Sequence, residues 1–230
     1  MGRRVGLIAL CLWTGLTIGC GGGGGGSQTT QQLRVVMASP DAPAVDILID
    51  GVQVATSLVY TNSTSYLPLK AGQRHVQALT VSNSTSIFDQ TISLTASANL
   101  TLLLTGPASK IQEVLLTDGS KTTTTTTGTG KVRVVNASIT MGPADVYIVN
   151  AGTGLAGATP VATSLSFDKN TEYESVPTGG GGYEVFMTSP GTTNLLLDTG
   201  ALALTQSQFQ TVIALDATGG GFNYIALTDQ

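Results

Sequence analysis

The chain has 230 residues, which is enough for one large domain or two small ones. Only 10% of these residues are charged, well below the roughly 25% that is usual in soluble domains, so Thr, Ser, Gly and Asn supply much of the polarity. The formal net charge of −4 comes without a basic stripe, which argues against nucleic-acid binding, and the scarcity of Glu and Lys beside abundant Thr and Val favours strands over helices.

The first 19 residues are predicted to be an export signal. Arg3 and Arg4 form a positively charged start, and residues 5–18 form an apolar run shorter than the roughly 20 residues that a membrane-spanning helix needs. The run leads to Cys20 in a segment that resembles the lipobox of bacterial lipoprotein signals, although Thr17 stands where lipoboxes prefer leucine. The alternative is an ordinary cleaved signal with a chance cysteine.

Residues 20–32 are predicted to be a lipidated Cys20 followed by a flexible tether. Six glycines and a Ser/Gln/Thr run offer no apolar side chains to bury. Glycine directly after the cysteine resembles the pattern of Gram-negative lipoproteins that are sorted to the outer membrane. We therefore expect an exported protein whose lipid anchors it to the cell envelope, at the outer membrane or cell surface. Cys11 lies within the signal, so the mature chain would have no thiol for a disulfide or a metal site.

An internal repeat organises the rest of the chain. Leu33–Ser39 (LRVVMAS) recurs as Val132–Ser138 (VRVVNAS), and both copies close on Leu-Thr-Asp. Between the copies, residues 119–131 contain six consecutive threonines and read as a low-complexity linker. We expect two domains, at 33–118 and 132–230, that fold separately like beads on a string.

Each repeat is predicted to be a small β-sandwich with an immunoglobulin-like outline. Asp50-Gly51 is typical of a tight hairpin turn, because both residues tolerate positive φ. The apolar runs at 101–104 and 211–215 are expected of central strands, and no helical periodicity is present. Strands of the first repeat are expected at residues 33–38, 45–50, 52–57, 64–69, 73–81, 86–94, 99–105 and 111–117.

The opening of the first repeat resembles a known family. Arg34–Gly51 (RVVMASPDAPAVDILIDG) looks like the signature of domain-of-unknown-function family 4397, which is usually found in exported bacterial proteins and often in tandem. The second copy loses the Ser-Pro-Asp-Ala-Pro part and reads Ser138–Pro143 (SITMGP). The family has no established catalytic residues, so the resemblance implies a fold and an export route but no activity.

A glycine-rich motif lies in an insertion that only the second repeat carries. Gly152–Gly157 (GTGLAG) fits the dinucleotide-binding pattern, which also requires a following helix whose N-terminus faces the phosphates. Thr159-Pro160 follows at once, and the next stretch reads as a strand. We therefore interpret the motif as a flexible hairpin loop, and no cofactor is expected.

His75 is the only histidine, so any mechanism that uses imidazole must use it. The alternation of the strand places it on the solvent face, and no Gly-x-Ser-x-Gly motif accompanies it. The sequence therefore predicts no enzyme and no catalytic residue.

Asp41, Asp46 and Asp50 are the densest acidic cluster, but they lack the spacing of a calcium loop. Asp145 recurs at the place of Asp46, and a structural hydrogen bond explains that recurrence as well as a ligand role does. No metal site is predicted.

The chemistry of the sequence leaves a non-catalytic module as the leading hypothesis. Its partners would be the membrane, through the lipid on Cys20, and an extracellular or periplasmic protein or glycan. A carbohydrate- or peptide-binding accessory or adhesion protein is the first alternative, and a hydrolase with an unrecognised site is the second. The tyrosines, spread through the expected strands, are expected to pack rather than to stack on sugars.

Overall fold

The computed structural model describes residues 30–95, 98–119 and 126–229, and these residues form an all-β structure, as expected from the sequence. Between their strands lies one short 3₁₀ turn, η1 (Ala108–Lys110). Within these ranges no helix is long and apolar enough to cross a membrane. The expected signal, Cys20 and most of the tether lie outside the described residues.

The first repeat consists of two four-stranded sheets. The strand order is β4-β1-β7-β8 in one sheet and β3-β2-β5-β6 in the other. Only β1 and β7 pair in parallel, and the other neighbours are antiparallel. The strands are β1 (Thr30–Met37), β2 (Val45–Ile49), β3 (Val52–Leu58), β4 (Leu67–Lys70), β5 (Gly72–Thr80), β6 (Ser86–Leu94), β7 (Asn99–Thr105) and β8 (Gln112–Asp118).

The second repeat has the same plan, with β9 and β16 as its parallel pair. One sheet runs β12-β9-β16-β17, with β13 also pairing β9, and the other runs β11-β10-β14-β15. The strands are β9 (Thr129–Asn136), β10 (Ala144–Asn150), β11 (Ala162–Leu165), β12 (Lys169–Asn170), β13 (Glu174–Pro177), β14 (Tyr183–Thr188), β15 (Leu195–Asp198), β16 (Phe209–Asp216) and β17 (Phe222–Asp229).

Each repeat is a sandwich in outline, but its strand order differs from that of a constant-type immunoglobulin domain. In a constant-type immunoglobulin domain the first two strands share a sheet. Here β1 and β2 lie in different sheets, because residues 38–44, with Pro40 and Pro43, carry the chain across the sandwich. The Asp50-Gly51 turn has the positive φ angles that a type I′ hairpin needs, 51° and 78°.

Each sandwich has its own core, which alternate residues of the strands fill. In β1, Leu33, Val35 and Met37 are fully buried against the facing sheet of the first repeat. In β9, Val132 and Val134 occupy the matching positions in the second core. This period of two is the pattern of a strand with one face toward a core.

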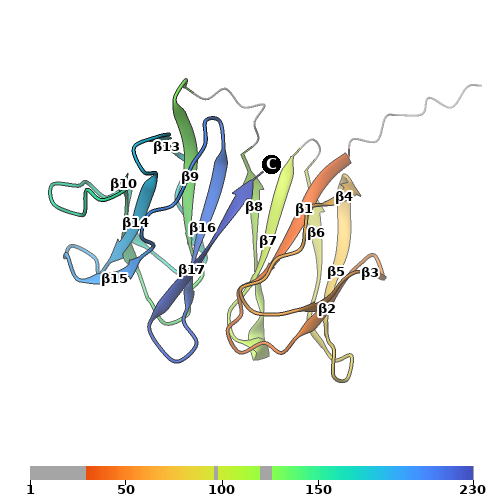
Figure 1. The fold of residues 1–230 in the computed structure, drawn as a ribbon. Coiled ribbons are helices and arrows are strands. Elements are labelled where there is room, and N and C mark those ends of the chain that lie inside the picture. The colour runs from red at the N-terminus through yellow and green to blue at the C-terminus, as the bar shows by residue number, and fades with distance from the viewer. Residues whose placement is uncertain (1–29, 96–97, 120–125, 230) are drawn as a thin grey trace, which may run out of the picture.

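A third core joins the two repeats. The outward residues Val36 of β1 and Leu103 of β7 pack in one buried cluster with Val135 of β9 and Ile213 of β16. The sheets that contain these strands therefore face each other at the centre of the molecule, and the other two sheets lie outside them (Figure 1). The expectation of two independent beads is wrong, because the repeats bury apolar surface against each other.

The double burial explains the continuous apolar runs. Residues 102–104 of β7 and 212–215 of β16 have one face in their own sandwich and the other in the shared core, and all of them are buried. Both strands are central in their sheets, as expected. A strand that is covered on both faces has no reason to alternate polar and apolar residues.

Candidate functional site

A buried set of charged side chains bridges the two repeats. Arg133 of β9 is 3% exposed, and its guanidinium donates to the carboxylate of Asp118 at the end of β8. It also donates to the carbonyl oxygen of Thr117 at 2.7 Å and to the hydroxyl of Thr211 at 2.8 Å. An arginine of the second repeat is thus held by the last strand of the first.

The same contact occurs with the repeats exchanged. Arg34 of β1 is 4% exposed and donates to the carboxylate of Asp229 at 2.7 Å and to the carbonyl oxygen of Thr228 at 2.9 Å. It also donates to the hydroxyl of Thr101 at 2.8 Å. We call the two arginines, Arg34 and Arg133, together with Asp118 and Asp229, the crossed clamp.

Two tyrosines complete the crossed clamp. The Tyr66 hydroxyl donates to Asp118 at 2.7 Å, and the Tyr173 hydroxyl donates to Asp229 at 2.6 Å. Arg34 lies over the ring of Tyr66 and Arg133 over the ring of Tyr173, each 4.7 Å from the ring centre, within cation–π range. Burial, and then the neighbouring carboxylates, raise the pKa of both tyrosines.

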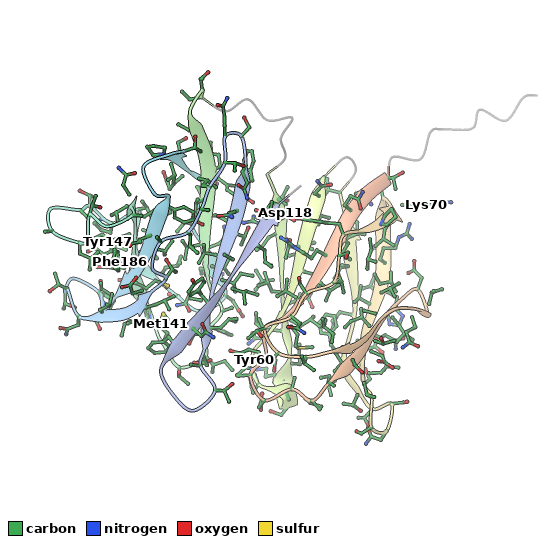
Figure 2. The ribbon with its side chains drawn as sticks, viewed as in Figure 1. Tyr60, Lys70, Asp118, Met141, Tyr147 and Phe186 are labelled. Carbon is green, nitrogen blue, oxygen red and sulfur yellow. The ribbon has the colours of Figure 1, made fainter. Side chains whose placement is uncertain are left out.

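The chemistry of the crossed clamp is structural. Two guanidinium groups balance two carboxylates, and every acceptor is hydrogen-bonded, which is the condition under which buried charges are tolerated. Burial and the charge of Asp229 raise the pKa of Asp118, while Arg133 opposes that shift. Figure 2 shows Asp118 between the two sandwiches, and its carboxylate is fully buried, so no substrate reaches it.

Sequence reasoning missed these arginines, although two signals were present. An arginine interrupts an apolar strand at the same place in both repeats, and both repeats close on Leu-Thr-Asp. A charge inside an apolar run that recurs with a distant aspartate indicates a buried ion pair. Neither signal tells which of the two aspartates each arginine contacts.

His75 lies on the solvent face of β5, as expected, with 43% of its side chain exposed. Its Nε2 is 2.6 Å from Asp89 of β6, and Gln77 donates to the same carboxylate at 2.8 Å. Hydrogen bonds from His75 and Gln77 lower the pKa of Asp89. Among the described residues no hydrogen bond from a Ser, Thr or Cys side chain to the imidazole is found.

The recurring aspartates have structural roles. Asp46 accepts from the backbone N–H of Ser57 at 3.0 Å, and Asp145 accepts from that of Ser164 at 2.8 Å. Both serines have a φ of 50° at an irregularity in the strand pairing, and the aspartate stabilises that backbone. Asp145 also accepts from the N–H of Gly191 at 2.7 Å.

The other two aspartates of the acidic cluster are engaged in turns. Asp41 accepts from the N–H of Ala108 at 2.7 Å, and Asp50 accepts from the N–H of His75 at 3.0 Å. In the part of the chain that the structure describes, no three His, Cys, Asp or Glu residues are grouped so as to hold a metal ion.

The tyrosines are largely committed to internal contacts. Besides Tyr66 and Tyr173, three more donate their hydroxyls: Tyr60 to the carbonyl of Asp216, Tyr183 to the side chain of Gln210, and Tyr224 to the carbonyl of Thr199. Tyr147, opposite Phe186 on the outer sheet of the second repeat, remains half-exposed (Figure 2). Little aromatic surface is left for stacking on a sugar ring.

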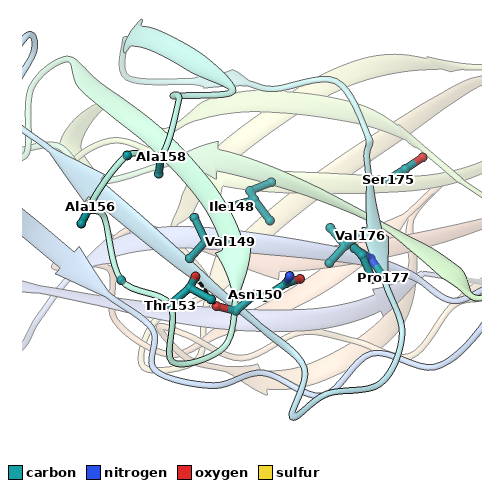
Figure 3. A pocket seen from close by; sticks show the side chains of 11 residues that line it. Ile148, Val149, Asn150, Thr153, Ala156, Ala158, Ser175, Val176 and Pro177 are labelled. Atoms are coloured by element: carbon teal, nitrogen blue, oxygen red, sulfur yellow. Dashed lines mark hydrogen bonds between the residues drawn. The ribbon is translucent and has the colours of Figure 1, made fainter.

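An open pocket of about 370 Å³ lies in the second repeat. One wall is the inserted loop with Thr153, Ala156 and Ala158, and another is β13; the end of β10 lies between them (Figure 3). The pocket therefore contains the Gly-rich motif, which is a loop without a following helix. No lining residue is charged; the lining residues are Ile148, Val149, Asn150, Thr153, Gly154, Ala156, Gly157, Ala158, Ser175, Val176 and Pro177.

Comparison with solved structures gives only distant likenesses. An alpha-glucan-binding streptococcal virulence factor aligns with 78% of this chain and 92% of its own, at 9% identity and a TM-score of 0.26. The Bacillus anthracis TIE protein aligns with 87% of this chain, at 10% identity and a TM-score of 0.25, and the alignment spans 44% of that protein's chain. TM-scores this low do not establish a shared fold.

A cell adhesion protein from Bacteroides uniformis, itself assigned that role provisionally, aligns with 88% of this chain and 97% of its own, at 12% identity and a TM-score of 0.25. No curated protein matches the sequence. The model of one family does match, over residues 31–147 and again over 130–230, in two overlapping segments that agree with the tandem arrangement. The chain therefore belongs to the DUF4397 family, a family of domains of unknown function, and carries two copies of its domain.

Proposed function

We propose that this protein is a non-catalytic binding module of the bacterial cell envelope, in which two joined sandwiches present the pocket of the second repeat. The observation that carries the proposal is the location of the ionisable side chains of the crossed clamp, which lie in the interface between the repeats and not in the pocket. The buried ionisable groups of the crossed clamp hold the repeats together, while the pocket is lined without any ionisable side chain.

A pocket of this kind is suited to binding and not to acid–base or nucleophilic chemistry. General acid–base catalysis needs a titratable group within hydrogen-bond reach of the substrate, and the lining offers only the polar side chains of Asn150, Thr153 and Ser175. The exposed His75–Asp89 pair belongs to the first repeat and not to this pocket. A hydrolase is the less favoured reading for both reasons.

Between the two binding alternatives, the pocket favours a peptide over a glycan. Sugar-binding sites commonly use an exposed aromatic face, and no aromatic side chain lines this pocket. Its walls carry small, uncharged side chains, and its floor is the edge of a strand. Those features suit a polypeptide backbone.

A binding screen tests this function. The intact two-repeat chain should bind a component of a library of peptides, glycans or cell-envelope extracts, and deletion of residues 151–158 should reduce that binding while the protein stays folded by circular dichroism. His75→Ala is the matched control and should bind like the parent. A measured activity that His75→Ala abolishes in a folded protein would overturn the non-catalytic proposal.

Anchoring by Cys20 is a separate part of the proposal and rests on the sequence alone. Each buried acyl CH₂ contributes about 0.8 kcal/mol, so more than one acyl chain holds a protein firmly on a membrane. Cys20→Ser should move the protein from the membrane to the soluble fraction, and the parent should show an acyl mass on its N-terminal peptide. Membrane fractionation that Cys20→Ser leaves unchanged would contradict the anchor.

A further inference from the structure

The two repeats differ at one edge of their outer sheets. In the first repeat the pairing of β3 with β2 has two irregularities but reaches the end of both strands, where Leu48 pairs with Gln53 and Ile49 with Val52. In the second repeat β11 pairs with β10 only at Ala144 and Val146. The two pairs that β11 makes match the Val45 and Ile47 pairs of the first repeat, and the rest of the ladder has no counterpart.

The sequence explains why β11 is short. When the Ala-Thr-Ser-Leu segments of the repeats are aligned, Pro160 falls at the place of Gln53. Proline has no N–H to donate to a ladder, so a strand stops there. The insertion before Pro160 then leads the chain away from β10 as the loop of the pocket.

The backbone of Ile148 faces the vacated position. Val146 accepts a hydrogen bond from the N–H of Val161, and Asn150 accepts one from Thr153, so the even residues of β10 point away from β14. Alternation places the N–H and C=O of Ile148 on the same side. Among the described residues, no strand pairs with Ile148 there. An unpaired strand edge of this kind is a template for another strand.

The open pocket lies along this edge. Ile148, Val149 and Asn150 line it, flanked by the inserted loop on one side and by Ser175–Pro177 of β13 on the other (Figure 3). The edge is thus a groove with two walls. No charged side chain lines the groove, so a charge on a bound segment would be buried there without a partner. The part of the segment that lies in the groove must therefore be uncharged.

We propose that the β10 edge binds an extended, uncharged segment of a partner protein, which adds to the outer sheet as a strand. The segment takes the place that residues 52–54 of β3 occupy in the first repeat, so small and β-branched side chains like those of Val52 and Val54 fit it. Backbone hydrogen bonds supply affinity, and the loop and β13 select side chains, as in other recognition by strand addition. This inference rests on the proposed binding function and names its ligand class.

A peptide with the sequence of residues 51–54 (GVQV), blocked at both ends, is the probe, because this part of β3 has no counterpart in the second repeat, whereas β11 already takes the place of residues 55–58. It should bind the intact chain saturably and slow hydrogen exchange of the Ile148 amide about tenfold or more, the effect of about one good hydrogen bond. Methylation of one peptide amide at a time provides the matched control. Methylation at the amide of Val52 should weaken binding about tenfold or more, and methylation at that of Gln53 should have little effect, because Val52 faces Ile49 in the first repeat and neighbouring strand residues point their N–H groups to opposite sides.

A variant of the protein tests the same point by pairing the free edge of β10 with a strand of its own chain. Replacing residues 149–161 with residues 50–54 (DGVQV) gives the second repeat the hairpin of the first and should abolish peptide binding. If this variant does not fold, the two methylated peptides still decide the matter with the parent protein.

The outcomes separate this inference from the proposed function. A glycan or small molecule that binds the pocket while the peptide does not would overturn strand addition and leave the binding function intact. Peptide binding that protects amides elsewhere, or that is equally sensitive to both methylations, would also overturn strand addition. If neither the peptide nor any component of the screen binds the protein, or if deletion of residues 151–158 leaves all measured binding unchanged, both the strand addition and the proposed function are overturned.

Discussion

Arg34 and Arg133 stand in strands whose neighbours are apolar, because each guanidinium reaches a carboxylate and a carbonyl oxygen of the other repeat and a threonine hydroxyl of its own. Moving such a charge from water into a protein interior is costly unless it is paired and hydrogen-bonded. Each arginine meets a carboxylate, a carbonyl oxygen and a threonine hydroxyl, and it lies over a tyrosine ring. Removal of one arginine therefore leaves a buried carboxylate without its main partner.

Arg133→Met should lower the free energy of unfolding by about 3–5 kcal/mol, the usual cost of breaking a buried pair. His75→Ala is the control, because His75 and its partner Asp89 have side chains that are 43% and 51% exposed, and exposed pairs contribute little to stability. Urea denaturation followed by circular dichroism measures both. Equal losses for the two variants would show that the crossed clamp contributes no more than a surface pair.

The paired aspartates of the strand irregularities should also differ in cost. Asp145 is 4% exposed and accepts from two backbone N–H groups, whereas Asp46 is half-buried and accepts from one. Asp145→Ala should lower stability by about 1–3 kcal/mol, since it removes two hydrogen bonds to a buried carboxylate, and Asp46→Ala by less. Thermal unfolding of both variants checks the order, and a larger loss for Asp46→Ala would contradict it.

At the scale of a residue, the sequence showed which residues recur in the two repeats, but not which residues they contact. The recurrence of Asp46 as Asp145 indicated a shared role, and hydrogen bonding was one of two roles left open. The partner of Arg34 could not be predicted, because Asp229 is 195 residues away and the two repeats each end on the same Leu-Thr-Asp. Local patterns carry no information about which of two identical motifs a side chain meets.

At the scale of the element, the strands of the first repeat were predicted to within a few residues. Period-two alternation and turn residues fix where such strands begin and end. The sequence did not predict that the outer faces of β7 and β16 are covered by the sheet of the other repeat. An apolar run shows that both faces of a strand are buried, but not whether the second cover belongs to the same domain.

The shared core leads to a prediction about the two halves of the chain. The Thr/Gly composition of residues 119–131 predicts that limited proteolysis cuts there first. Because the third core and the crossed clamp remain, the fragments should stay associated in native buffer and separate only in denaturant. Size-exclusion chromatography followed by mass spectrometry shows this directly. Fragments that elute separately without denaturant would mean that the interface contributes little.

At the scale of the whole molecule, the two sandwiches and their interface form four sheet layers with three cores (Figure 1). Tyr60 fastens one end of the interface, because its hydroxyl donates to the carbonyl oxygen of Asp216 in the other repeat at 2.6 Å. Burial, and then the nearby Asp216 carboxylate, raise the pKa of Tyr60 to about 12. The molecule should therefore respond to alkaline pH through its interface.

The folded chain holds the Tyr60 proton more tightly than the unfolded chain, whose tyrosine has the ordinary pKa of 10.0. The contribution of this group to stability is therefore fully present below pH 10 and is lost as pH rises toward 12. Urea denaturation at several pH values between 9 and 12 should show this loss, and Tyr60→Phe should show a shallower one. The same slope in both proteins would remove Tyr60 as a cause.

The crossed clamp also bears on the ancestry of the chain. Each repeat offers one arginine and one aspartate, and each finds its complement in the other copy, which is the pattern of a twofold-symmetric dimer whose subunits became one polypeptide. After such a fusion, selection acts on Arg34 jointly with Asp229 and on Arg133 jointly with Asp118. Among descendants of the duplication, a change at one member should be inherited together with a compensating change in the opposite copy, while the loops of the two copies are free to diverge.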